Sequence, residues 1–266
     1  AILVTGALMV ATYAIVNGNG EGWTSTQTLG LLGASLAMLA AFVVVETNVA
    51  APLMPMRLLK QRNLSIANVV GVLWAAAMFA WFFMSALYLQ LVLGYSPLEV
   101  GLAFLPGNIV MGILSVGVSA RLVMRFGIRR PLGAGLGVAT LGLLLFARAP
   151  VGGDFLVDVL PAMLLLGFGA GIAFNPVLLA AMNDVEPHES GLASGLVNTA
   201  FMMGGALGLA VLASLAEART EALSGDGHLA ALAGGYHLAF LVGAVFATLA
   251  AVLGAGLLRP RMAPAS

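Results

Sequence analysis

The side chains best suited to chemistry in this sequence are aromatic rings, thioethers, hydroxyls and amides that stand at helical spacing inside long apolar runs. Trp74, Met78, Trp81 and Ser85 follow the spacing i, i+4, i+7 and i+11, so they share one face of an α-helix. Residues of the same kinds lie in three later runs: Phe104, Asn108, Asn175 and Asn198. Flat rings and flexible thioethers accommodate many shapes, while one or two amides orient a ligand. The pattern predicts a binding cavity for bulky lipophilic molecules, lined by these residues.

Ordinary helix packing is the alternative for each of these side chains, with each asparagine bonding a carbonyl of a neighbouring helix. Polar residues inside apolar runs are costly in lipid, so they mark either a helix contact or a path through the protein. The four faces together favour a cavity, whereas one side chain alone does not.

Catalytic and metal chemistry lacks the residues that it needs. The sequence has no cysteine, which removes thiol catalysis, disulfides and thiolate metal sites. Glu46, Asp158, Glu217 and His237 lie near the ends of apolar runs rather than at mid-depth. A hydrolase needs a nucleophile, a base and an orienting group at one depth. We therefore expect no catalytic residue, no cofactor and no metal site.

Long apolar runs supply the elements that would position the binding residues. Hydrophobic residues make up 61% of the chain and charged residues 8%, and the mean hydropathy is +1.05. Soluble domains carry roughly 25% charged residues, so a soluble protein is excluded. A run of about 20 apolar residues crosses a bilayer, and it does so as a helix because backbone groups in lipid must bond to one another. The sequence predicts an all-α, multi-pass membrane protein.

Eight membrane-spanning helices are expected, in two parts. Residues 1–63 are predicted to hold two linker helices, at 1–16 and 28–45, followed by a loop. Residues 64–266 are predicted to form a six-helix domain, with spans at 64–93, 97–120, 131–147, 162–182, 190–214 and 235–258. Ser96 and Glu99, with Pro97 between them, match a capping box at the start of the fourth span.

Glycine and proline within the spans predict local features of packing. Gly191 stands four residues before Gly195, and Gly204 four before Gly208, which is the spacing that lets two membrane helices approach closely. Pro106 and Pro176 each remove a backbone donor well inside a span and predict a kink there.

Basic residues are grouped on one side of the predicted membrane. The net charge is zero, so no overall basic field favours nucleic-acid binding. If the loop before residue 64 faces the cytoplasm, alternate crossings put these residues inside: Arg57, Lys60, Arg62, Arg121, Arg125, Arg129, Arg130, Arg259 and Arg261. Arg148 and Arg219 fall outside. This distribution obeys the positive-inside rule and places the C-terminus in the cytoplasm.

A gate is predicted from three arginines of one inner loop and three acids of another. The residues are Arg125, Arg129, Arg130, Asp184, Glu186 and Glu189. Opposite charges on one side of the membrane can pair in one conformation and separate in another. The alternative is that the arginines serve only orientation and lipid contact.

Three short segments between Asn175 and Leu212 carry a family resemblance: Gly191-Leu192-Ala193-Ser194-Gly195, Asn198-Thr199, and Gly204-Gly205-Ala206-Leu207-Gly208. Together they resemble the carboxy-terminal half of major facilitator transporters, and more narrowly of drug:proton antiporters with fourteen spanning helices. Residues 120–131 resemble the facilitator loop motif Gly-x-Leu-x-Asp-Arg-x-Gly-x-Arg, although Ala120 and Met124 replace its leading glycine and its aspartate.

The resemblance implies a proton-coupled efflux carrier of the plasma membrane that exports small lipophilic molecules by alternating access. The chain has no initiator methionine and begins within an apolar run, so we expect it to be the carboxy-terminal portion. Its partners would then be the lipophilic substrate, protons, the lipid bilayer and a missing six-helix amino-terminal half that carries the coupling acid. The alternative is a helical scaffold or dimerisation module that does not transport, which would account for the small-residue spacing equally well.

Overall fold

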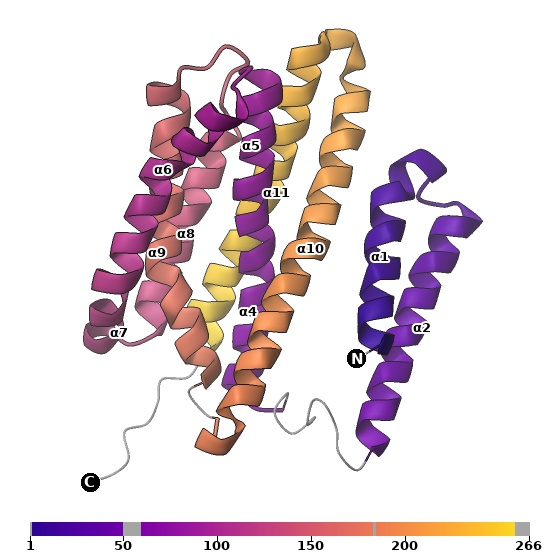
Figure 1. The fold of residues 1–266 in the computed structure, drawn as a ribbon, viewed down its shortest axis with the longest axis vertical. Helices are drawn as coiled ribbons and strands as arrows, with labels where there is room; N and C mark the ends of the chain where they lie inside the picture. The colour runs from indigo at the N-terminus through magenta and orange to yellow at the C-terminus, as the bar shows by residue number, and fades with distance from the viewer. Residues whose placement is uncertain (1, 50–59, 183–184, 259–266) are drawn as a thin grey trace.

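The structure is a computed structural model that describes residues 2–49, 60–182 and 185–258. Every regular element in these ranges is helical. The α-helices, labelled as in Figure 1, are α1 Ile2–Glu21, α2 Thr26–Asn48, α4 Arg62–Phe79, α5 Ser85–Leu87, α6 Pro97–Ile113, α7 Ala120–Phe126, α8 Arg129–Phe146, α9 Leu160–Met182, α10 Ser190–Ala222 and α11 His228–Leu257. The all-α prediction is therefore confirmed for the described part of the chain.

Segments of π-helix lengthen three of these helices into longer continuous rods. They are η1 Ala80–Met84, η2 Tyr88–Val92, η3 Leu114–Ser119 and η4 Phe155–Val159. Consequently one continuous helix over 62–92 consists of α4, η1, α5 and η2. A second, over 97–126, consists of α6, η3 and α7, and a third, over 155–182, consists of η4 and α9. Single turns of 3₁₀-helix, η5 Pro187–Glu189 and η6 Ser224–Asp226, precede α10 and α11.

Seven of the described helices are long and apolar enough to cross a membrane. The expected span at 131–147 corresponds to α8, which has 18 residues, begins with two arginines and is not among the seven. It nevertheless packs between α9 and α11 along the bundle (Figure 1). The total of eight spans stays a prediction, whereas the multi-pass character of the chain is established.

Two groups of helices are visible in Figure 1. Helices α4 to α11 form an up-and-down bundle in which α9 contacts α4, α6 and α8. Helices α1 and α2 form a hairpin that stands beside the bundle, where α1 packs on α10. The largest fully buried side chains belong to the bundle and include Trp74, Trp81, Tyr88 and Phe146.

Glycines set the closest helix contacts in the bundle. A Cβ on Gly204 would lie 2.6 Å from the Val72 Cα, and Gly208 lies equally tightly against Ala76, so α10 approaches the backbone of α4 through these two positions. The packing prediction is therefore confirmed for Gly204 and Gly208. It is wrong for Gly191 and Gly195, because no neighbouring helix among the described residues lies within 4 Å of a Cβ built on either.

Helix ends follow local capping signals more closely than hydropathy. The Ser96 side chain accepts a bond from the Glu99 N–H and Glu99 bonds back to Ser96, so the predicted capping box is present. Helix α1 runs to Glu21, five residues past the expected end, and stops at Gly22, whose φ of +89° suits a residue without Cβ. Ser25 then caps α2 through a bond from the Thr28 N–H.

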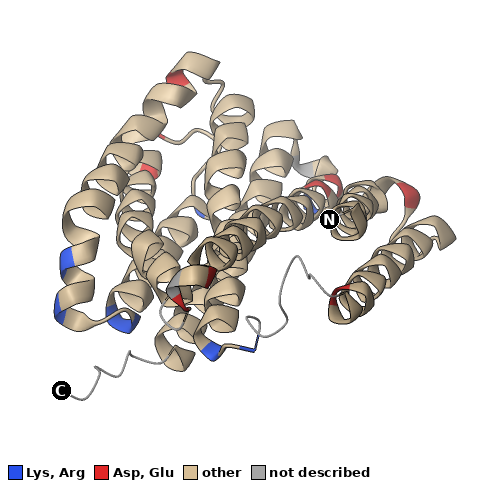
Figure 2. Cartoon of the chain, turned by 60° about the horizontal axis from the view of Figure 1, so that its bottom comes forward, with Lys and Arg blue, Asp and Glu red and all other residues tan. Residues whose placement is uncertain are grey.

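Basic residues gather at one end of the bundle, as Figure 2 shows with the bottom of Figure 1 turned forward, whereas acidic residues occur at both ends. Arg62 begins α4, Arg125 lies in the last turn of α7, and Arg129 and Arg130 begin α8, so all four lie at this end. Arg148 follows α8 at the opposite end. The structure thus brings the predicted inner basic residues to a shared face wherever it describes them, while Arg57, Arg259 and Arg261 lie outside the described residues.

Candidate functional site

A cavity of about 380 Å³ lies between α4, α9 and α10. Its lining consists of Trp74, Phe174, Val177, Leu178, Ser194, Gly195, Val197, Asn198 and Phe201. The α9 residues lie in the last three turns of that helix and the α10 residues in its first four, so the cavity sits toward the basic end of the bundle. It is large enough for a small organic molecule and is mostly apolar.

Trp74 is the most buried of the polar side chains that line this cavity. Its side chain is 1% exposed, and its Nε1–H has no hydrogen-bond partner in the described part of the chain. An indole N–H can only donate, and a buried donor left unpaired costs roughly 1–3 kcal/mol. Trp74 therefore belongs to the cavity wall, while its Nε1–H is buried without a protein partner among the described residues.

Two further polar side chains lie on the α10 side of the cavity. Ser194 and Asn198 are both exposed and stand four residues apart on one face of α10. Gly195 between them has open space where a side chain would stand. The glycine thus leaves room in the cavity rather than serving a helix contact, which explains why the packing prediction fails at this position.

The other residues predicted on the face of α4 and its continuation lie in the interior of the bundle. The Trp81 side chain is fully buried, and its Nε1–H donates to the Met163 Sδ of α9 at 3.2 Å. The buried Ser85 hydroxyl donates to the Trp81 carbonyl of its own helix, and Met78 is half-buried against the core. From Ala80 the π-helical turn changes the spacing, so a face drawn at α-helical intervals does not continue beyond this residue.

Two of the predicted residues of α6 and α9 also make helix contacts. Phe104 stacks on Phe82 with ring centroids 5.6 Å apart. Asn175 donates through Nδ2 to the Ser115 carbonyl at 2.7 Å, which ties α9 to η3. Asn108 is half-buried and its Oδ1 has no partner in the described residues. Of the residues predicted to bind substrate, the structure brings Trp74 and Asn198 together at one cavity and places these three elsewhere.

Sequence patterns missed the aromatic wall of the cavity. Phe174 and Phe201 meet edge-on, with centroids 6.2 Å apart and ring planes at 84°. Phe174, Val177 and Leu178 form an i, i+3, i+4 stripe on α9, which was the available signal. It was hidden because α9 is apolar on all sides, so that no face of it stands out by hydropathy.

A second cavity, of about 640 Å³, lies along the contact between α1 and α10. It is lined mainly by α1 residues from Val4 to Asn17 and by Thr199, Met203, Ala206 and Leu207 of α10. Beyond its upper end the two helices are joined, because Asn19 Nδ2 donates to the Ser214 carbonyl at 2.7 Å and to Glu217 Oε2 at 3.1 Å. Trp23 Nε1 donates to the Asn19 Oδ1 at 2.9 Å and so fixes the amide orientation.

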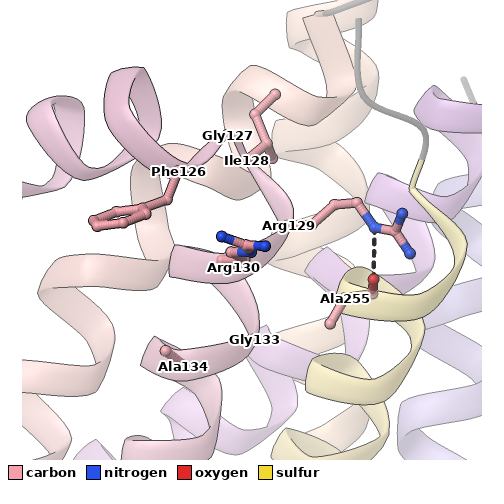
Figure 3. Close-up of a pocket in the computed structure, with 8 residues that line it drawn as sticks. All are labelled: Phe126, Gly127, Ile128, Arg129, Arg130, Gly133, Ala134 and Ala255. Carbon is pink, nitrogen blue, oxygen red and sulfur yellow. Dashed lines mark hydrogen bonds between the residues drawn. The ribbon is translucent and has the colours of Figure 1, made fainter.

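A third, open cavity of about 630 Å³ lies where α7 turns into α8 and is lined by residues 126–130, Gly133, Ala134 and Ala255 (Figure 3). Arg129 leaves this turn toward α11 and donates from Nε to the Ala255 carbonyl at 2.6 Å and from Nη2 to the Gly256 carbonyl at 2.7 Å. The turn itself is made by Gly127, whose φ is +74°. Arg129 therefore closes the carboxyl end of α11.

The other members of the predicted gate lie near this end of the bundle. Arg130 is exposed and lies beside the α7–α8 turn (Figure 3). The Arg125 guanidinium lies 5.3 Å from the centre of the Phe126 ring. In the loop before α10, His188 Nδ1 is 3.4 Å from Glu186 Oε2, and Glu189 is half-buried. Asp184 lies outside the described residues, and pairing across the two loops stays a prediction.

Comparison with known proteins places this helical bundle in a family. The sequence model described as Major Facilitator Superfamily matches residues 1–209. The chain belongs to this superfamily. The cavity between α4, α9 and α10 therefore lies in a polypeptide that is related to membrane transporters.

Curated relatives are named for drug resistance and export. The puromycin resistance protein pur8 of Streptomyces alboniger is 34% identical over 227 residues, which cover 85% of this chain and 45% of the relative. The cephamycin export protein CmcT of Amycolatopsis lactamdurans is 34% identical, over 80% of this chain and 44% of the relative. The multidrug resistance protein Stp of Mycobacterium tuberculosis is 33% identical, over 80% and 39%. The chain thus spans less than half the length of these relatives.

Proposed function

We propose that the chain is the carboxy-terminal portion of a fourteen-helix, proton-coupled carrier that exports small lipophilic molecules across the plasma membrane. The observation that carries this proposal is the apolar cavity with Trp74, Ser194 and Asn198 in a member of the major facilitator superfamily. Relatives named for antibiotic resistance and export support the substrate class. Family membership favours a carrier over the scaffold or dimerisation module and over an enzyme.

The arrangement of helices supports a division of the carrier into parts. Residues 1–63 supply two linker helices, and residues 64–266 supply a six-helix half that works against an amino-terminal half by alternating access. The basic end of the bundle faces the cytoplasm, as does the C-terminus. The described spans hold no acid at mid-depth, so the carboxylate that takes up the proton belongs to the other half.

The remaining predicted residues contribute in two ways. Trp74 and Asn198 contact substrate in the conformation described here. Met78, Trp81, Ser85, Phe104 and Asn175 line the path only in another access state, since they now make contacts between or within helices. Asn108 joins them in that state, where its amide binds substrate. Arg125, Arg130 and Glu186 form the gate together with Asp184 and Glu189.

Co-expression provides the test of this function. Cells without their own exporters receive the chain together with an amino-terminal six-helix half, and resistance to lipophilic antibiotics is measured. We expect resistance from the pair and none from the chain alone, because one half of the cavity wall and the coupling acid are missing. Proton-dependent export by the chain alone in proteoliposomes would contradict the proposal.

A matched pair of glycine variants tests whether exported molecules pass through the cavity between α4, α9 and α10. Gly195→Leu places a side chain in the cavity, whereas Gly191→Leu, one turn earlier on α10, enters open space outside it. We expect Gly195→Leu to lower resistance about tenfold, the effect of losing about 1.4 kcal/mol of substrate binding, and Gly191→Leu to leave it unchanged. Equal resistance of the two variants at equal protein abundance would remove the cavity from the transport path.

A further inference from the structure

We propose that Ser119 and Asn175 are positioning residues of the carrier. Through bonds between η3 and α9 they fix the last turns of α9, which form one wall of the cavity between α4, α9 and α10. The inference rests on the proposed function and deepens it, because it names the contacts that hold the wall of the binding cavity in place.

A proline leaves one carbonyl of α9 without its helical partner. Pro176 lies inside α9 and has no N–H, so the Ile172 carbonyl, four residues earlier, receives no bond from the next turn of its own helix. A buried carbonyl without a donor is strongly disfavoured. The fully buried Ser119 supplies the donor, because its hydroxyl donates to the Ile172 carbonyl at 3.0 Å. A side chain of the neighbouring helix thus replaces the backbone donor that the proline lacks.

A second bond runs in the opposite direction between the same two helices. Asn175, the residue before the proline, donates through Nδ2 to the Ser115 carbonyl at 2.7 Å. Ser115 and Ser119 both lie in the π-helical segment η3, a form of helix that is frequent at functional sites. Each helix therefore gives one side-chain donor and one backbone acceptor. Two such bonds on neighbouring turns fix both the height and the rotation of α9 against η3.

The cavity lies on another side of the same turns of α9. Phe174, Val177 and Leu178 line it, and with 3.6 residues per turn all three point away from Ile172. Val177 and Leu178 follow the proline, so they belong to the segment whose position the two bonds fix. The position of this wall is therefore set by contacts outside the cavity.

Ordinary packing of Ser119 predicts a different pattern of mutational effects. A hydroxyl that only fills space matters equally with and without the proline. A hydroxyl that replaces a missing N–H matters only while the proline is present, because Pro176→Ala restores the backbone donor to the Ile172 carbonyl. The dependence of one substitution on the other therefore separates the two roles.

A single cysteine at Leu178 reports the position of the wall in the complete 266-residue chain in lipid nanodiscs. The chain has no native cysteine, so labelling of Leu178→Cys by a water-soluble maleimide has no background. We expect Ser119→Ala to raise the labelling rate about 2- to 12-fold, the effect of one net hydrogen bond on the population of the fixed wall. In the Pro176→Ala background the same substitution should leave the rate unchanged.

Three further variants control this measurement. Ser35→Ala removes another buried hydroxyl that bonds a carbonyl of a neighbouring helix, Ala7 at 2.7 Å, and should leave the rate unchanged because this bond joins α1 and α2. Ser119→Thr keeps the hydroxyl and should keep the original rate. Asn175→Leu removes the second bond and should raise the rate in both backgrounds, since the proline does not free the Ser115 carbonyl.

The contrary outcomes are distinct from those of the export experiment. An effect of Ser119→Ala that is no larger than that of Ser35→Ala, or that is the same with and without Pro176, overturns the positioning role. If Ser119→Ala alone yields no folded chain in size-exclusion chromatography, the added Pro176→Ala must restore it, and failure to do so also overturns the role. None of these results decides export, which the co-expression experiment tests by itself. Loss of export there, with the dependence on Pro176 intact, would refute the proposed function and not the positioning of the wall.

Discussion

Arg129 and Arg130 are neighbours in the sequence with different surroundings. Arg129 bonds two carbonyls at the end of α11, where unpaired carbonyls carry the partial negative charge of a helix terminus. Arg130 is exposed beside the same turn. Arg129 thus has a fixed partner within the six-helix bundle, whereas Arg130 is the better candidate for a contact that changes between states.

Removal of the Arg129 charge should therefore weaken the bundle. We expect Arg129→Gln to lower the free energy of unfolding by about 1–2 kcal/mol, since bonds from a charged donor at a helix end are lost. Arg130→Gln serves as the control and should change it by less than about 0.5 kcal/mol. Thermal unfolding of the purified chain in detergent measures both, and equal shifts would show that the α11 contact contributes nothing.

The gate is tested most cleanly with the exposed arginine. We expect Arg130→Glu to change the ratio of inward to outward accessibility of the complete carrier, and the added Glu186→Arg to restore part of it. Exposed pairs contribute only about 0–1 kcal/mol each, so expression should stay nearly constant. Cysteine accessibility in a double-mutant cycle measures the coupling. If neither Arg125 nor Arg130 couples with any of the three gate acids, the arginines serve only to orient the chain in the membrane and to contact lipid.

Helix α10 has two glycine pairs with opposite roles. Gly204 and Gly208 bring it against α4, whereas Gly191 and Gly195 face open space. The spacing of small residues is identical in both pairs, so sequence alone predicted the same contact for each. The difference arises because α10 meets the backbone of α4 closely at Gly204 and Gly208, whereas Gly195 lines the cavity between α4, α9 and α10.

An added methyl group distinguishes the two pairs. At Gly204 a Cβ would stand 2.6 Å from the Val72 Cα and 2.8 Å from its carbonyl oxygen, so Gly204→Ala must push α4 and α10 apart. We expect it to destabilise the chain by about 1–3 kcal/mol. Gly191→Ala has no neighbour to displace and should be neutral or stabilise by up to about 1 kcal/mol. Equilibrium unfolding by denaturant in mixed micelles compares them, and similar values would disprove the close contact.

Hydropathy predicts the spans well and their ends less well. The helix expected at 64–93 occupies 62–92, but α10 continues to Ala222 although 214 was the expected end. Glu217, Arg219 and Glu221 reduce hydropathy there, yet charged residues favour the final turns of a helix that emerges from the lipid. The π-helical segments were not predicted because these helices are apolar on most faces, so the change of spacing that a π-helical turn causes is hidden in the hydropathy pattern.

The sequence predicted which types of residue line a cavity, but not whether a given side chain faces the cavity or bonds to a neighbouring helix. Trp74 and Asn198 line the cavity, while Trp81 and Asn175 of the same residue types bond to Met163 and Ser115. Which of these outcomes applies depends on the neighbouring helix that each side chain meets. That information lies in residues distant in the sequence, so spacing within one helix could not supply it.

At the scale of the whole molecule, charge and fold agree on two opposite ends. Gly127 lies in the turn between α7 and α8 at the basic end, and Gly225 lies between α10 and α11 at the other. The chain has no native cysteine, so single substitutions give no background. We expect Gly127→Cys to react only from the cytoplasmic side and Gly225→Cys only from outside, as shown by an impermeant maleimide applied to intact cells and to inverted vesicles. Labelling of both from one side would refute the eight-span topology.

The bond between Asn19 and Ser214 joins residues 195 positions apart. A ribosome adds about 5–20 residues per second. Helices α1 and α2 therefore wait roughly 10–40 seconds in the membrane until Ser214 of α10, the partner of Asn19, has been made. During this interval the hairpin has only its own contacts, such as the bond from the Ser35 hydroxyl to the Ala7 carbonyl. Assembly of this protein is therefore a late event in its synthesis, and a stalled chain that ends before residue 214 would leave the hairpin free to diffuse and to meet other helices.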